Sequence, residues 1–326
     1  MSKNVVATPS VEQKTNITIP DRYAREIRER EHIIDACPIK VFTSSINPRW
    51  SWPWKLNAAN EARPSVPPSC DEMMIDPGLN NRCGPLAAAH AAAKTDADYV
   101  LGRDLPPTQC PERVSDDEVW RVSIERVANY MIEHRRLREA DSVSLGTWDL
   151  AHDAEAIAPI QPPYIESLKY MAEPIKRDTP HGPMQITILD ETDYIAVGGL
   201  LSFDDVTERV EKLQEVREHV GDEMKIHALA PGTGLPVIRA IRDDPALIDS
   251  LDVSTPETGP SNGRLPDKTW TQHDHNLPRG TDSTTIRAQY SGAIALQLAY
   301  MLGPYCNDPV LDQDNDQTEQ QSLLDV

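Results

Sequence analysis

Short apolar runs alternate with amphipathic stretches along most of the chain, and this alternation limits the fold more than any other feature. The short runs have the length of buried strands, whereas the longer stretches repeat their apolar residues at helical spacing. Strands that alternate with helices indicate parallel βα units, because a parallel connection must cross back over the sheet. We predict seven strands, at residues 39–45, 72–76, 98–102, 156–161, 193–199, 224–229 and 247–253.

The predicted helices lie between or after these strands, at residues 84–94, 116–137, 163–176, 202–220, 234–244 and 284–302. Seven strands over roughly 260 residues fit a (β/α)8 TIM-type barrel, an α/β fold, better than a doubly wound sheet. No GxGxxG follows a first strand, as a dinucleotide-binding sheet would require. The eighth strand is not evident, and it is either an irregular N-terminal piece or residues 184–189.

We expect one barrel domain at residues 19–306, between a flexible N-terminus at 1–18 and an acidic flexible tail at 307–326. Five scattered cysteines without a CxxC pair indicate reduced thiols of a cytoplasmic protein and not a disulfide framework. The polar first residues do not resemble a signal peptide. The most apolar stretch, residues 290–302, is too short for a membrane span and contains Gln297, so it predicts a buried helix.

The chain is strongly acidic, with a formal net charge of −20, few lysines and two phenylalanines. Such a charge normally argues against a nucleic-acid partner. The composition nevertheless resembles that of proteins from extreme halophiles, in which molar salt screens charges within about 3 Å. The acidic balance therefore does not exclude a DNA substrate.

Polar residues and glycines follow the predicted strands where a parallel barrel carries its chemistry. Each alone is typical of a turn or a helix cap. Together they suit a guanine, because a carboxylate accepts from N1–H and the 2-amino group, an amide pairs with another edge, and glycine lets backbone N–H groups approach. Two further carboxylates then supply a nucleophile and an acid/base. We expect one cavity surrounded by Asp76, Asp104, Gln161, Gly198, Gly199 and Asp252.

Four segments resemble motifs of the tRNA-guanine transglycosylases, in the same order and at similar intervals. They read "DYVLGRDLPPTQ", "IAPIQPPYIESL", "DYIAVGGL" and "IDSLDVSTP". The resemblance covers roughly residues 40–260 and is closest to the shorter DNA 7-deazaguanine transglycosylase branch, found in viral genomes and DNA-modification clusters.

The resemblance implies that Asp252 is the covalent nucleophile and that Asp76 transfers protons. It also implies base recognition by Asp104 and Gln161, with the backbone of the Gly198–Gly199 pair facing the base. The implied enzyme is a glycosyltransferase that exchanges guanine in DNA for a 7-deazaguanine such as preQ0 or preQ1, without a cofactor. Its partners would be DNA, or alternatively tRNA, and the free base.

The chain departs from the family pattern in four respects. The D-S-G-G motif reads Asp76-Pro77-Gly78-Leu79, which puts the geometry of that loop in doubt. The zinc site of the tRNA enzymes is missing, since only a weak set of His273, His275 and Cys306 follows the nucleophile. The Arg-rich segment after the nucleophile is missing too, and no RNA-binding domain follows. These losses favour DNA over tRNA as the substrate.

Several alternatives stay open. One alternative is a tRNA enzyme without RNA-binding domains. Another is a non-catalytic barrel subunit of a modification complex; Pro77 favours this second alternative, whereas the presence of both Asp76 and Asp252 opposes it. An unrelated barrel hydrolase or lyase is disfavoured, because no HxH follows a first strand and no Gly-rich phosphate loop occurs late in the chain. His227, at another strand end, either lines the mouth or packs as a structural histidine.

Overall fold

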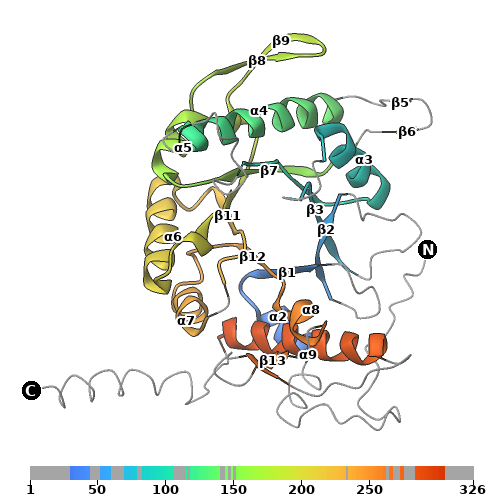
Figure 1. The fold of residues 1–326 in the computed structure, drawn as a ribbon, viewed down its shortest axis with the longest axis vertical. Coiled ribbons are helices and arrows are strands. Elements are labelled where there is room, and N and C mark those ends of the chain that lie inside the picture. The colour runs from blue at the N-terminus through green and yellow to red at the C-terminus, as the bar shows by residue number, and fades with distance from the viewer. Residues whose placement is uncertain are drawn as a thin grey trace, which may run out of the picture.

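Eight parallel strands close into a barrel at the centre of the molecule (Figure 1). The computed structural model describes residues 30–44, 52–59, 70–78, 83–105, 115, 118–139, 144–145, 148–149, 152–232, 234–261, 264–266, 272–274 and 283–304. The strands, in chain order, are β1 (Lys40–Ser44), β2 (Trp54–Ala58), β3 (Glu72–Asp76), β4 (Tyr99–Leu101), β7 (Glu155–Ile160), β10 (Tyr194–Val197), β11 (Lys225–Ala228) and β12 (Ser250–Val253). Each strand pairs with its neighbours in this order, and β12 returns to pair with β1. The predicted (β/α)8 TIM-type fold is confirmed.

Helices surround the barrel and follow their strands along the chain (Figure 1). They are α3 (Pro85–Thr95), α4 (Val119–Arg138), α5 (Tyr164–Met171), α6 (Val206–Val220) and α7 (Leu235–Asp243). The last helix, α9 (Ser283–Leu302), packs against β1 and α7, and α2 (Arg30–Ala36) packs against α9. The helix that covers β1 on the outside of the barrel therefore comes from the C-terminal end of the described chain. Between β12 and α9 lies α8 (Thr255–Ser261).

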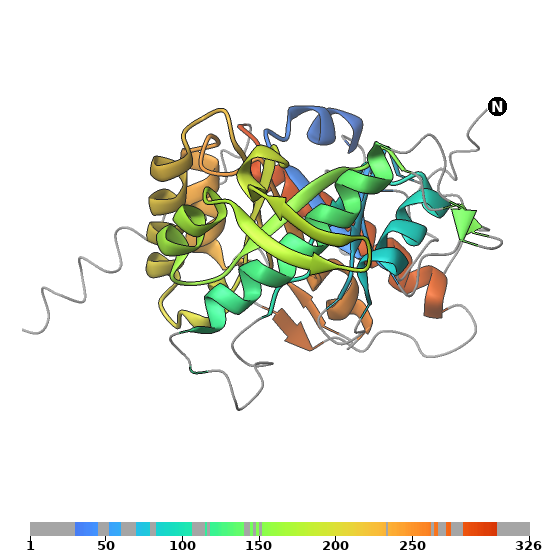
Figure 2. The ribbon, with the colours of Figure 1, turned by 90° about the horizontal axis from the view of Figure 1, so that it is seen from above.

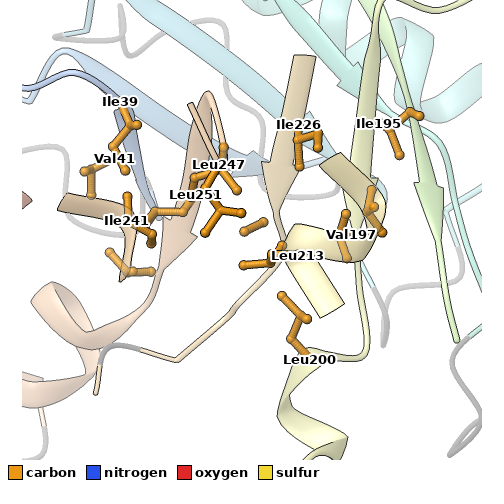
Figure 3. Close-up of a cluster of buried hydrophobic side chains, with 14 of the residues drawn as sticks. Ile39, Val41, Ile195, Val197, Leu200, Leu213, Ile226, Ile241, Leu247 and Leu251 are labelled. Atoms are coloured by element: carbon orange, nitrogen blue, oxygen red, sulfur yellow. The ribbon is translucent and has the colours of Figure 1, made fainter. Parts of the chain in front are cut away.

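The layer between the barrel and its helices is aliphatic, as the scarcity of phenylalanine requires (Figure 3). Outward-facing residues of the strands, such as Ile226 and Leu251, belong to the same cluster as Leu213 of α6 and Ile241 of α7. Each fully buried side chain of this kind stabilises the fold by about 1.5–3 kcal/mol relative to exposure. The strands are thereby fixed in register by packing on their outer face.

The barrel interior is filled by side chains, so it is not a pore. Phe42 lies within it and meets the ring of Tyr99 edge-to-face at 6.0 Å. At the amino-terminal end, Lys40 forms a 2.6 Å ion pair with Glu72, and the Tyr99 hydroxyl donates to Glu72 at 2.8 Å. These contacts fill the amino-terminal end of the barrel, so we expect a reaction site at the carboxyl-terminal end of the strands.

The eighth strand of the barrel is β2, so the first of the two alternatives left open by the sequence, an N-terminal piece, is confirmed. Lys55 and Asn57 are buried on its outer side and give the segment the appearance of a polar loop. Residues 184–189 were the wrong candidate, because they begin in the outer strand of a hairpin and continue into a 3-10 turn, η4 (Ile188–Asp190).

That hairpin consists of β8 (Ile175–Thr179) and β9 (Gly182–Ile186), which pair antiparallel and pack on α4 outside the barrel (Figures 1 and 2). It replaces the end of the helix predicted at residues 163–176, which stops at Met171. In both strands buried and exposed residues alternate, as expected of strands with one face in solvent.

Smaller elements complete the description. The hairpin β13 (Arg264–Pro266) and β14 (Gln272–Asp274), in orange, lies on the opposite side of the barrel from α2, in blue (Figure 2). A second short hairpin joins β5 (Ser144–Leu145) to β6 (Trp148–Asp149), and η5 (Leu200–Ser202) follows β10. The predicted flexible segments, 1–18 and 307–326, lie outside the described residues.

The described part of the chain bears on the expectations about cysteines and about membrane-spanning segments. Cys37, Cys70 and Cys83, the cysteines within the described part, are free thiols. Among the helices of that part, none combines the length and the apolar character that crossing a membrane requires.

Candidate active site

The residues singled out from the sequence come from the same end of the barrel. Asp76 is the last residue of β3, and Asp252 is the third of four residues in β12. Gln161 follows β7 and Gly198 follows β10, and these two strands are neighbours. Because the strands are parallel, their carboxyl ends share one mouth, and Asp104, three residues beyond β4, joins it there.

Asp252 faces inward because side chains alternate along β12. Leu251 and Val253 point outward into the aliphatic layer, as the sequence predicts. The backbone N–H of Ala230 donates to Asp252 Oδ1 at 2.6 Å, and His227 Nε2 lies 3.5 Å from the same oxygen. Within the described residues Oδ2 of Asp252 has no hydrogen-bond partner. One carboxylate oxygen is thus held by the protein, and the other remains available.

Asp76 is held in a similar way, by the loop that begins at Pro77. Pro77 has no N–H, and the amide of Gly78 donates to Asp76 Oδ1 at 2.7 Å. Gly78 adopts a left-handed conformation with φ of 73°, which glycine tolerates without strain. The loop therefore keeps a backbone donor on this carboxylate although Pro77 has none.

Burial, together with the negative charges of Asp252 and Asp104, raises the pKa of Asp76 to about 6, although the hydrogen bond from Gly78 lowers it. Asp252 and Asp104 therefore both lie near enough to Asp76 to influence its ionisation. A carboxylic acid with a pKa near neutrality can donate a proton and take it back during one reaction cycle.

Asp104 and Gln161 contact each other directly, since the Gln161 side-chain amide donates to Asp104 Oδ2. Burial raises the pKa of Asp104, and the hydrogen bond from Gln161 opposes this. Gln161 Oε1 is buried, and no described residue donates to it. A buried acceptor without a donor is uncommon in folded proteins and marks a place where a ligand can bind.

The Gly198–Gly199 pair is required by its contact with Gln161. A Cβ at Gly198 would overlap Gln161 Nε2 and would lie 3.3 Å from the Ile160 carbonyl oxygen. Gly199 has φ of 73°, and a Cβ there would overlap Gln161 Oε1. Only glycine at both positions leaves the Gln161 amide where it meets Asp104. The Tyr164 hydroxyl donates to the Gly198 carbonyl at 2.7 Å and fixes this turn.

His227 is fully buried, and it lies between the core and the candidate nucleophile. The sequence left open whether this histidine packs in the core or lines the mouth of the barrel. The structure shows both contacts, because the ring meets Phe42 edge-to-face at 5.8 Å and Nε2 faces Asp252. Sequence reasoning missed Ser250 and Tyr194, which continue this contact inside the barrel. Alternation along β12 places Ser250 on the face of Asp252, but its contact with His227 depends on register between strands.

No group of three or more His, Cys, Asp or Glu side chains in the described part is arranged to hold a metal ion. The weak zinc candidates are not placed, because His275 and Cys306 lie outside that part and the side chain of His273 is not described. The expected lack of a zinc site or other cofactor stays a prediction.

The arrangement can support substitution at a carbon that bears a nitrogen base. It combines an acid/base carboxylate, a second carboxylate with one free oxygen, and an amide–carboxylate pair beside two glycines. No protein-family model matches the chain, and a search of curated proteins finds none similar to it. The chemical interpretation therefore rests on the geometry of these residues.

Proposed function

We propose that the chain is a DNA-guanine transglycosylase, which exchanges guanine in DNA for a 7-deazaguanine base through a covalent aspartyl intermediate. The observation that carries the proposal is that Asp76 and Asp252 each have one oxygen fixed by a backbone N–H, at 2.7 and 2.6 Å, while the other lacks a partner among the described residues. Paired carboxylates of this kind suit a retaining glycosyl transfer, in which one acts as nucleophile and the other as acid and base.

Base recognition is assigned to Asp104 and Gln161. The carboxylate accepts from guanine N1–H and its 2-amino group, and the unpartnered Gln161 Oε1 offers a further acceptor. The Gly198–Gly199 turn supplies backbone close to the base, since no Cβ intervenes. A 7-deazaguanine presents the same hydrogen-bonding edge as guanine, so one site serves both the leaving and the entering base.

In the first half of the reaction a guanine leaves the base stack and enters the mouth of the barrel. Asp252 Oδ2 attacks C1′ as the bond from C1′ to N9 breaks, and the electron pair of that bond passes to N9. The protonated form of Asp76 donates its proton to the departing guanine, consistent with its pKa of about 6. The products are an ester between Asp252 and the sugar, and free guanine.

In the second half a 7-deazaguanine occupies the same place. Asp76 accepts its N9 proton, N9 attacks C1′, and the ester bond breaks with its electron pair returning to Asp252. Atoms and charges balance over the cycle without an oxidant, a reductant or a nucleotide cofactor. Carbon in place of N7 makes the inserted base a poorer leaving group, so insertion is favoured over its reversal.

The proposal is tested by incubating the protein in molar salt with labelled preQ0 or preQ1 and either guanine-containing DNA or tRNA. Nucleoside mass spectrometry then reports which polymer acquires the deazaguanine. We expect incorporation into DNA, a protein–DNA adduct on denaturing gels, and loss of both in Asp252→Ala. Incorporation into tRNA alone would support the tRNA alternative, and wild-type incorporation by Asp252→Ala would remove this aspartate from the mechanism.

A further inference from the structure

A line of polar side chains runs through the otherwise apolar barrel interior to the candidate nucleophile. The Tyr194 hydroxyl hydrogen-bonds to Ser250 Oγ, and Ser250 Oγ lies 2.8 Å from His227 Nδ1. His227 Nε2 in turn faces Asp252 Oδ1 at 3.5 Å. Tyr194, Ser250 and His227 are buried, so none of them is satisfied by bulk water.

The hydrogen bonds of this line have one consistent direction. The Tyr194 hydroxyl can donate to Ser250, whose own proton then points to His227 Nδ1. A neutral imidazole that accepts at Nδ1 carries its proton on Nε2, which is the atom facing Asp252. Each member is then a donor to the next, and the last proton is directed at the carboxylate.

The same carboxylate oxygen receives a second donor from the backbone. The N–H of Ala230 reaches Asp252 Oδ1 at 2.6 Å, and Ala230 has a positive φ of 42°, in the left-handed region that favours glycine. Both donors come from β11 and the turn that follows it. They converge on Oδ1 and leave Oδ2, which faces no donor in the described part of the chain.

We propose that His227 is a positioning residue for the nucleophile: its Nε2–H acts with the Ala230 N–H to hold Asp252 Oδ1, so that Oδ2 is the atom that attacks C1′. This inference rests on the proposed transglycosylase reaction. In the second half of that reaction the carboxylate is regenerated as the leaving group, and a donor already aimed at Oδ1 stabilises the returning charge.

Packing alone does not require a histidine at this position. The surrounding interior contains Phe42 and Ala196, and an apolar side chain would avoid the cost of burying a polar ring. The 3.5 Å contact is too long for an ordinary hydrogen bond, and Nε2 has no other partner among the described residues. Such contacts in a resting site tighten when the substrate is bound.

Two substitutions separate positioning from packing. The side-chain amide of His227→Gln reaches about as far as Nε2 and can still donate to Asp252. The shorter amide of His227→Asn reaches only the Nδ1 position and keeps the contact with Ser250. We expect His227→Asn to lower kcat for deazaguanine insertion about 100-fold with an unchanged KM for the base, and His227→Gln to stay within about tenfold of the wild type. Equal kcat values for the two variants, with equal thermal stability, would overturn the proposal.

A spectroscopic measurement tests the same contact without any substrate. In 15N-labelled protein, the imidazole signals of His227 are identified by their absence in His227→Gln. We expect the tautomer protonated on Nε2, with a shift of its signal in Asp252→Asn. A signal from the Nδ1-protonated tautomer would overturn the inference, since Nε2 would then have no proton for Asp252. If wild-type protein inserts no deazaguanine, the proposed function fails, and this spectrum alone still decides whether His227 holds Asp252.

Discussion

Replacement of Asp76 by asparagine is expected to stabilise the fold while removing activity. In the folded chain the pKa of Asp76 is raised from 3.8 to about 6, chiefly by burial. Keeping this carboxylate ionised at neutral pH therefore costs folding free energy. Asparagine has no charge to bury, and its Oδ1 can still accept from the Gly78 N–H, 2.7 Å from Oδ1 in the wild type.

The size of the effect follows from the raised pKa. One pKa unit corresponds to about 1.4 kcal/mol, so a rise from 3.8 to about 6 sets an upper bound of about 3 kcal/mol. Between these two values the folded chain binds more protons than the unfolded chain, and stability falls as the pH rises. The deficit is complete above about pH 7 and absent below about pH 3.8. We expect Asp76→Asn to gain about 1–3 kcal/mol at neutral pH, because its weaker hydrogen bond to Gly78 offsets part of the gain.

Urea denaturation in constant molar salt, at about pH 8 and about pH 4.5, measures the gain at each pH. The matched control is Glu223→Gln, which removes an exposed carboxylate before β11 and corrects for the change in net charge. The gain of Asp76→Asn should exceed that of the control at the higher pH and should shrink at the lower pH. A loss of stability at the higher pH, or a gain that does not depend on pH, would refute the reasoning.

Two further predictions concern other parts of the barrel. Gly198→Ala should abolish deazaguanine insertion, because the added Cβ displaces the Gln161 amide from Asp104. Base-binding calorimetry should show lost affinity, and wild-type affinity would contradict this prediction. Burial lowers the pKa of His134 to about 3 and that of His152 to about 4, so the unfolded chain takes up protons first as the pH falls below about 6.5. Between about pH 7 and about pH 5, His134→Leu should lose roughly 2 kcal/mol less stability than the wild type, as measured by denaturation at both pH values. An equal loss in the two proteins would contradict this prediction.

Seven of the eight barrel strands could be predicted from the sequence because their residues are buried on both faces and read as apolar runs. Strand β2 was not predicted, because two of its five residues, Lys55 and Asn57, are polar although they are buried. The β8–β9 hairpin was not predicted, because the helical pattern of the sequence continues for a few residues beyond Met171, where the helix ends. In both cases tertiary packing overrides the local pattern.

The candidate site was predictable to the extent that it depends on strand ends. Asp76 and Asp252 follow from the rule that polar residues at the carboxyl ends of barrel strands meet at one mouth. The contact between His227 and Ser250 does not follow from that rule, since it requires the register of β11 against β12. Nor does the sequence reveal that Gly78 replaces a missing donor at Pro77, which depends on a positive φ.

The pairing of β1 with β12 has a consequence for how the chain reaches its folded state. Lys40 pairs with Ser250, so the first strand to leave the ribosome waits for the last before both of its edges are covered. Contacts this distant in sequence are slow to form, because a long loop must close before they stabilise anything. Throughout synthesis β1 presents an open strand edge, which is a template for association between unfinished chains. The −20 net charge opposes such association by repulsion until β12 pairs with β1 and covers this edge.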